Sequence, residues 1–153
     1  MRGIMIRFTQ TAFFIILATI LFCSPAMAER KAHTRVTVIH ASTGPRHVDP
    51  GLSPIISELE SVFKYTSYRL ITSSDMTLGM NQTGRVSLPG KRTLTVTPMN
   101  AGRGRIPYQI RIMKKRKPVF QTKILLKNNS SLTIGGPQHK KGVLLFNIQG
   151  NLN

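Results

Sequence analysis

The residues whose types and spacing could best support chemistry are His40, His47 and Asp49, in the stretch HASTGPRHVDP. Imidazole and carboxylate groups are ligands that zinc accepts. The three residues do not form a compact ligand motif, however, and the surrounding positive charge repels cations. They are therefore weak metal candidates, and the sequence predicts no metal site and no other cofactor.

The chain has few residues that could perform acid–base or nucleophilic catalysis. The acids number five: Glu29, Asp49, Glu58, Glu60 and Asp75. Glu58 and Glu60 stand two positions apart, which places them on different sides of a helix, whereas paired-carboxylate chemistry needs convergence. There is no G-x-S-x-G motif to present a nucleophilic serine. An enzyme is not predicted, and a metal-dependent or Ser/His hydrolase is the least favoured reading.

The strongest chemical feature is the basic run from Lys114 to Lys117, which stands between two apolar stretches. It predicts an anion-binding surface, and the alternative is a generally basic surface without a specific ligand. Nucleic acid is not favoured, because the nearby Tyr108 alternates with isoleucines and is expected in the core instead of stacking on bases. The candidate residues are Arg103, Arg105, Arg111, Lys114, Lys115, Arg116, Lys117 and Lys123.

The N-terminal segment reads as a secretory signal peptide. Arg2 and Arg7 make a positive start, an apolar run follows over residues 12–22, and the segment ends in the small residues Ala26 and Ala28. The apolar run is shorter than the ~18–20 residues that span a bilayer. We expect cleavage after Ala28 and export to the periplasm or the exterior, so membrane contact would be peripheral only.

Cleavage would leave a strongly basic chain without cysteine. Cys23 is the only cysteine, so the mature protein would have no disulfide. It would keep 20 of the 22 Lys and Arg residues and all five acids, for a net charge of about +15. Such a field favours anionic partners: head groups, acidic polymers or an acidic protein of the cell envelope.

Most of the chain after this segment predicts β-strands. Strands with alternating polarity or β-branched residues are separated by turns such as NQTG, PGK and NAGRGR. The expected strands cover residues 35–42, 67–75, 76–80, 85–88, 92–99, 106–113, 119–126, 131–136 and 142–148. The KKRKP stretch then becomes the connection of a β-hairpin, with its charges exposed.

One helix is expected over Leu52–Tyr65. Ser53 would be its N-cap and Pro54 its first residue. Its apolar stripe consists of Ile55, Ile56, Leu59, Val62 and Phe63.

These elements predict an α+β fold, predominantly antiparallel β (a meander or a sandwich) with one packed helix near residues 52–65. The expected organisation is a signal peptide over residues 1–28, a flexible N-terminus over 29–34 and a single β-rich domain over 35–150.

Three segments of the chain resemble small signal-peptide-bearing proteins that bacteria export: DPGLSPIISELESVFKYTSYRLI, SLPGKRTLTVTP and TKILLKNNSSLTIGGPQHKKGVLLFNI. The resemblance implies export and assigns no functional residue.

The sequence therefore favours a non-enzymatic binding or scaffolding protein of the cell envelope, which contacts an anionic partner through a basic hairpin surface. The alternative is an accessory subunit of an envelope secretion or pilus apparatus, which would use sheet edges for contact. The oligomeric state is not predicted.

Overall fold

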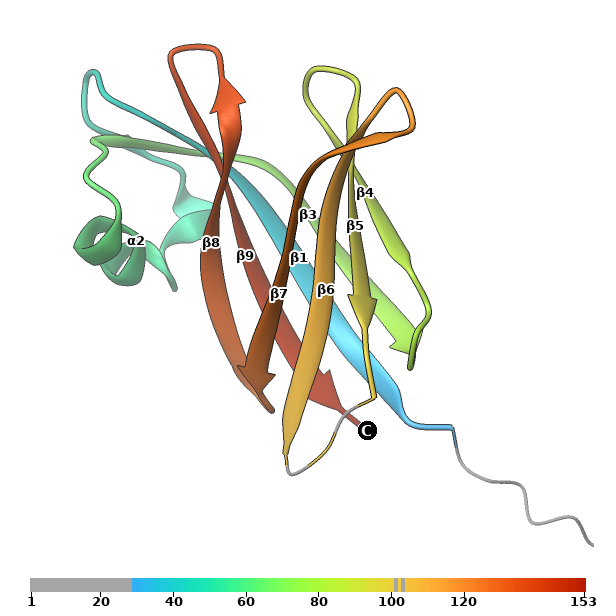
Figure 1. Cartoon of the computed structure of the whole chain (residues 1–153). Helices are drawn as coiled ribbons and strands as arrows, with labels where there is room; N and C mark the ends of the chain where they lie inside the picture. The colour runs from blue at the N-terminus through green and yellow to red at the C-terminus, as the bar shows by residue number, and fades with distance from the viewer. Residues whose placement is uncertain (1–28, 101, 103) are drawn as a thin grey trace, which may run out of the picture.

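The computed structural model describes residues 29–100, 102 and 104–153. The predicted signal peptide, its cleavage site after Ala28 and Arg103 lie outside these residues. The described residues form two β-sheets that face each other, with one α-helix against one of them (Figure 1). This confirms the predicted α+β class with predominant antiparallel β-structure. Of the two predicted arrangements, a meander or a sandwich, the structure shows the sandwich. Among the described residues, no helix has the length and apolar character needed to cross a membrane.

The five-stranded sheet, called sheet A, has the order β2-β3-β1-β9-β8. Its strands are β1 (Lys31–Ser42), β2 (His47–Val48), β3 (Ser67–Gly79), β8 (Ser130–His139) and β9 (Gly142–Leu152). All neighbours are antiparallel except the short β2, which pairs parallel to β3. The four-stranded sheet, called sheet B, is a meander of β4 (Gly84–Leu88), β5 (Arg92–Pro98), β6 (Arg105–Lys114) and β7 (Lys117–Lys127).

The core between the sheets follows from period-2 alternation, because every second side chain of a strand points to the same face. Sheet A contributes β-branched and aromatic residues such as Val36, Val38 and Phe146, and sheet B contributes residues such as Val96 and Ile110, all fully buried. The predicted apolar face of β6 is confirmed: Ile106, Tyr108, Ile110 and Ile112 are 0% exposed.

A second core lies on the opposite face of sheet A. There the 3₁₀ turn η1 (Pro50–Leu52) and the helix α2 (Ile56–Val62) bury Leu52 and Leu59 against the sheet. The Tyr68 hydroxyl on β3 donates to the carbonyl oxygen of Phe63 at 2.6 Å, which satisfies one of the acceptors that a helix C-terminus leaves free. The strand thereby anchors the end of the helix.

Several element boundaries differ from the sequence expectation. The segment 29–34 was expected to be loose, but β1 begins at Lys31 because Ala32 and Thr34 are buried against the rest of the fold. The two strands expected over 67–80 form the single strand β3, which pairs with β1 along its whole length from Ser67 to Gly79.

The helix is also shorter than expected. Ser53 is not its N-cap, because its hydroxyl donates back to the carbonyl oxygen of Pro50 and belongs to the preceding 3₁₀ turn. Ile55 stands at the N-cap without a side-chain hydrogen bond. Val62 is 64% exposed, so the apolar stripe is narrower than the pattern indicated.

A buried hydrogen bond crosses the core between the two sheets. Thr34 Oγ1 on β1 and the Tyr108 hydroxyl on β6 lie 2.8 Å apart. Burial raises the pKa of Tyr108 above its ordinary value, and the contact with Thr34 opposes that shift. Gly150 makes room for the pair, because a Cβ atom there would lie 2.7 Å from the tyrosine oxygen.

A second polar link joins the sheets at one end. Arg92 of sheet B donates to the carbonyl oxygens of Pro89 (3.0 Å) and Gln138 (3.3 Å), and one of its terminal nitrogens lies 3.4 Å from His139 Nδ1. The rings of His139 and His40 meet edge to face at 5.5 Å. Partial burial first, then repulsion from His40, Arg92 and Lys140, holds the pKa of His139 below its ordinary value.

We predict that Thr34→Val and Tyr108→Phe each destabilise the protein, because each leaves one buried hydroxyl without its partner. The expected loss is about 1–3 kcal/mol in the free energy of unfolding. The double variant should lose less than the sum, since both polar groups are then removed together. Urea denaturation of the four proteins measures the coupling, and strictly additive losses would contradict the linkage.

We also predict that stability falls in mild acid through His139. The pKa of His139 is lowered in the folded chain from the ordinary 6.5, so folding favours its neutral ring. The contribution of this ring to the free energy of unfolding is complete above about pH 6.5. It is lost as the pH falls from there toward the folded-state pKa. His139→Gln should flatten this dependence in urea midpoints recorded across that range. An unchanged pH profile in the variant would refute the role.

Candidate anion-binding surface

The charged residues are distributed unequally between the two sheets. The segment 84–127, which forms sheet B and its turns, holds 12 Lys and Arg residues and no Asp or Glu. All five acids lie in residues 29–75, which include β1, β3 and the helical cover of sheet A. Sheet B and its turns therefore carry basic side chains without acidic ones, whereas sheet A and its helical cover carry both basic and acidic side chains.

Alternation turns the cations of sheet B away from the core. The cross-strand register places Arg85, Thr95, Arg111 and Gln121 in one row across β4, β5, β6 and β7. The backbones of Arg85 and Arg111 lie two strands apart, which corresponds to about 10 Å. Arg105, Lys123 and Lys127 lie on the same face. We call this set, together with Arg85 and Arg111, the basic face.

A depression with a volume of about 500 Å³ lies on the basic face. Arg85, Arg111 and Arg116 supply its charge, and hydroxyl and amide side chains fill the spaces between them. Its remaining lining consists of Thr83, Thr93, Thr95, Thr97, Gln109 and Met113. Guanidinium groups among hydroxyls suit the oxygens of phosphate, sulfate or carboxylate groups.

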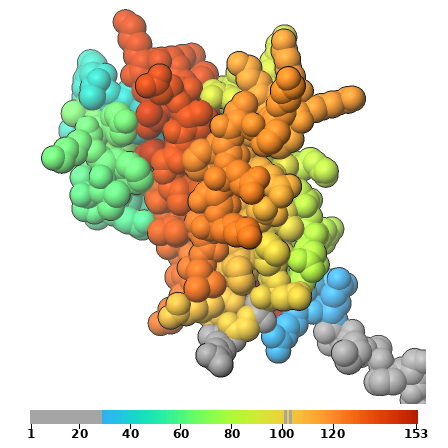
Figure 2. All heavy atoms as spheres, in the orientation of Figure 1, coloured from blue at the N-terminus to red at the C-terminus, as the bar shows by residue number. Residues whose placement is uncertain are grey.

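The basic run forms the tight turn at the end of this face, as the sequence predicted. Lys114 pairs with Lys117, so Lys115 and Arg116 alone make the connection between β6 and β7. Both have positive φ angles, 47° and 67°, the pattern of a type I′ hairpin turn, where Asn and Gly are preferred. Side chains of this hairpin project beyond the body of the molecule (Figure 2).

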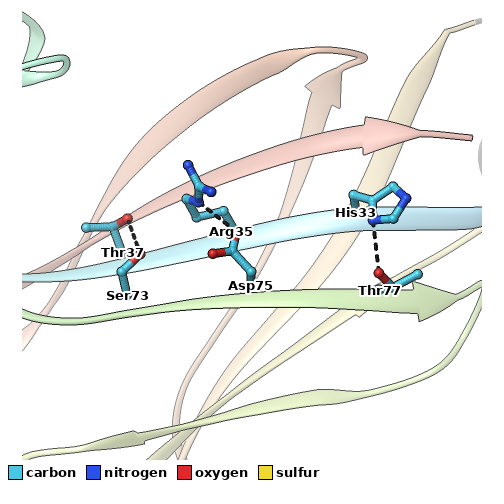
Figure 3. A network of polar contacts seen from close by, with 6 residues as sticks. All are labelled: His33, Arg35, Thr37, Ser73, Asp75 and Thr77. Atoms are coloured by element: carbon cyan, nitrogen blue, oxygen red, sulfur yellow. Dashed lines mark hydrogen bonds and ion pairs between the residues drawn. The ribbon is translucent and has the colours of Figure 1, made fainter.

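The outer face of sheet A carries a different polar array (Figure 3). Three cross-strand pairs lie in register between β1 and β3: His33 with Thr77, Arg35 with Asp75, and Thr37 with Ser73. Arg35 Nε contacts Asp75 Oδ1 at 2.6 Å, and this bond raises the pKa of Arg35. The carboxylate neutralises the arginine, so this pair adds no net charge to the face, in contrast to the arginines of the basic face.

The weak metal candidates do not converge. His40 Nε2 donates to the carbonyl oxygen of His139, 3.1 Å away. His47 Nε2 lies 2.7 Å from Asp49 Oδ1, and the Leu70 amide donates to Asp49 Oδ2. These two hydrogen bonds, the one from His47 being the larger effect, lower the pKa of Asp49. Across residues 29–100, 102 and 104–153, no group of three or more His, Cys, Asp or Glu side chains could hold a metal ion.

The structure places the predicted anion-binding residues in two groups. Arg105, Arg111 and Lys123 lie on the basic face, whereas Lys114–Lys117 occupy the turn at its end. Sequence reasoning missed Arg85 and Lys127, which share the face. The alternation of β4 signalled the exposure of Arg85, but only the order of strands brings it into the row of Arg111.

The comparisons with known proteins contribute little. No family model matches the sequence, and no curated protein matches it. A search of solved structures finds similarity to the T2SS secretin XcpQ from Pseudomonas aeruginosa, with a TM-score of 0.45 and 8% sequence identity. The alignment covers 95% of this chain and 63% of the secretin chain. Similarity at this level supports no conclusion about function.

We predict that the β6–β7 turn carries its charge at a cost in stability. Replacing Lys115 and Arg116 by Asn and Gly should raise the free energy of unfolding by about 1 kcal/mol or more, because Asn and Gly accept positive φ more readily than Lys and Arg. Arg111→Gln, which removes a charge from a strand position, is the control and should change stability little. Urea denaturation measures both, and a less stable turn variant would contradict the prediction.

Proposed function

We propose that this chain is an exported, non-enzymatic binding or scaffolding protein of the cell envelope that contacts an anionic partner through the basic face and the adjoining turn. The observation that carries the proposal is the segregation of charge: 12 cations and no acid in the segment that forms sheet B. Without acids in that segment, no ion pair within it can neutralise the guanidinium and ammonium groups. Their field is directed outward, to the solvent.

The stability of sheet B supports a role for this charge in binding. Its inner face packs apolar residues throughout, so the core already holds the sheet against sheet A. Like charges on one face repel each other and contribute nothing to folding. An anionic partner would relieve that repulsion, and the threonine and glutamine side chains of the depression offer it additional hydrogen bonds.

A second candidate is an accessory subunit of an envelope secretion or pilus apparatus that adds a strand at a sheet edge. It is favoured by β7, the last strand of sheet B, on which Val119 and Leu125 are 52% and 55% exposed. Exposed apolar residues on an unpaired edge suit strand addition. Replacing Lys114–Lys117 with Gln separates the two candidates, because it should abolish contact with an anion and preserve contact at the edge.

We predict that the purified protein binds dextran sulfate and that its affinity falls steeply as salt is added. The double variant Arg111→Gln/Lys123→Gln should lose roughly ten-fold in affinity, which corresponds to about 0.7 kcal/mol for each cation. Lys31→Gln/Lys64→Gln removes the same charge from the side of sheet A and is the matched control.

Isothermal titration at several salt concentrations measures both variants. Equal losses in the two double variants would mean that net charge alone attracts the polymer. An affinity that does not change with salt would end the electrostatic proposal.

A further inference from the structure

One end of the sandwich collects basic turns from both sheets. The β4–β5, β6–β7 and β8–β9 turns and the loop after β1 all lie at the upper end in Figure 1. We call this the basic end. Its cations are Arg46, Lys91, Arg92, Lys114, Lys115, Arg116, Lys117, Lys140 and Lys141. The described turns at the opposite end contain amides, as at Asn81–Gln82 and Asn128–Asn129, while Arg105 and Lys127 pair on the strands beside them.

The backbone at the basic end is unfavourable for the residues that occupy it. Lys91, Lys115, Arg116 and Lys140 have positive φ angles of 54°, 47°, 67° and 51°. Straight-chain residues seldom adopt this region, and each one costs roughly 1–2 kcal/mol relative to right-handed geometry. At the opposite end the comparable positions are asparagines, Asn81 and Asn129, which tolerate it well. Lysine and arginine therefore occupy these turn positions at the basic end although their backbone conformation disfavours them.

The basic end also contains a pocket with a volume of about 610 Å³ beside the β8–β9 turn. Arg69, Lys140 and Lys141 line it, together with the loop that carries Arg46 and His47. Two acids contact residues of the lining and have basic partners there: Glu60 contacts Arg46 at 2.9 Å, and Asp49 contacts His47. In the part of the chain that the structure describes, Lys140 and Lys141 form no ion pair, so the pocket remains positive.

We infer that the protein docks end-on, through the basic end, on the planar surface of a membrane rich in anionic phospholipid. Two facing sheets stand about 10 Å apart, and a flat surface can contact the turns of both at once. An acidic polymer that follows the basic face would contact the cations of sheet B and leave those of the β8–β9 turn unused. The inference rests on the proposed function and names its anionic partner.

The magnitudes suit peripheral binding. Each Lys or Arg close to an anionic leaflet contributes about 1 kcal/mol, and the contribution decays within a Debye length. Several turns that reach the surface together would therefore give reversible, salt-sensitive attachment. Lys91, Lys140 and Lys141 are all exposed, and each is replaceable without disturbing the apolar core.

Two triple variants with the same loss of charge test the inference. The end variant is Lys91→Gln/Lys140→Gln/Lys141→Gln, and the face variant is Arg85→Gln/Arg111→Gln/Lys123→Gln. Both are compared with the parent chain by co-sedimentation with vesicles of phosphatidylglycerol and phosphatidylcholine. We expect the end variant to lose roughly ten-fold or more in partitioning to phosphatidylglycerol, and the face variant to lose clearly less. Thermal unfolding by circular dichroism verifies that both variants fold.

Three outcomes would count against a proposal, and they are distinguishable. If the face variant loses as much vesicle binding as the end variant, or more, end-on docking is overturned and the proposed function stands. If the parent chain binds dextran sulfate but not phosphatidylglycerol vesicles, the partner is a polymer and the lipid inference is overturned. If it binds neither, the proposed function itself fails.

Discussion

The structure depends on strand β1, which lies between two apolar cores and contributes to both. Val38 faces sheet B, whereas the next residue, Ile39, faces the helical cover, and both are fully buried. The register between β1 and β3 shifts at this point. Since β1 pairs with β3 on one side and with β9 on the other, its position determines where the helix, sheet A and sheet B lie relative to one another.

The same constraint leaves sheet B free to carry charge. Its inner face is fully engaged with sheet A, so its stability does not require ion pairs on the outer face. Rows of threonine and arginine can therefore point to the solvent without acids between them. On sheet A the equivalent polar rows contain an acid, and Arg35 is paired with Asp75. The outer faces of the two packed sheets thus differ in electrostatic character.

Much of the fold could be predicted from local patterns. Alternation identified the strands of sheet B, and Pro-Gly and Asn-rich stretches identified turns. The length of the helix could not be predicted in this way, because a serine before a proline fits a helix N-terminus, whereas Ser53 ends the preceding 3₁₀ turn. The exposure of Val62 depends on how far the helix reaches over sheet A, which periodicity does not contain. For the candidate anion-binding surface, Lys114–Lys117, Arg111 and Lys123 could be grouped because they are close together in the sequence.

The sequence by itself determined that the chain is β-rich and basic, and that its basic run lies at an exposed hairpin turn, because strand alternation and turn residues act over a few neighbouring positions. Only the tertiary structure decided which cations share a surface. Arg85 joins Arg111 through the strand order of sheet B, and Lys140 comes to the same end as Lys91 because the two sheets pack with those turns together. These relations arise from pairing between residues far apart in the chain, and no local pattern records them.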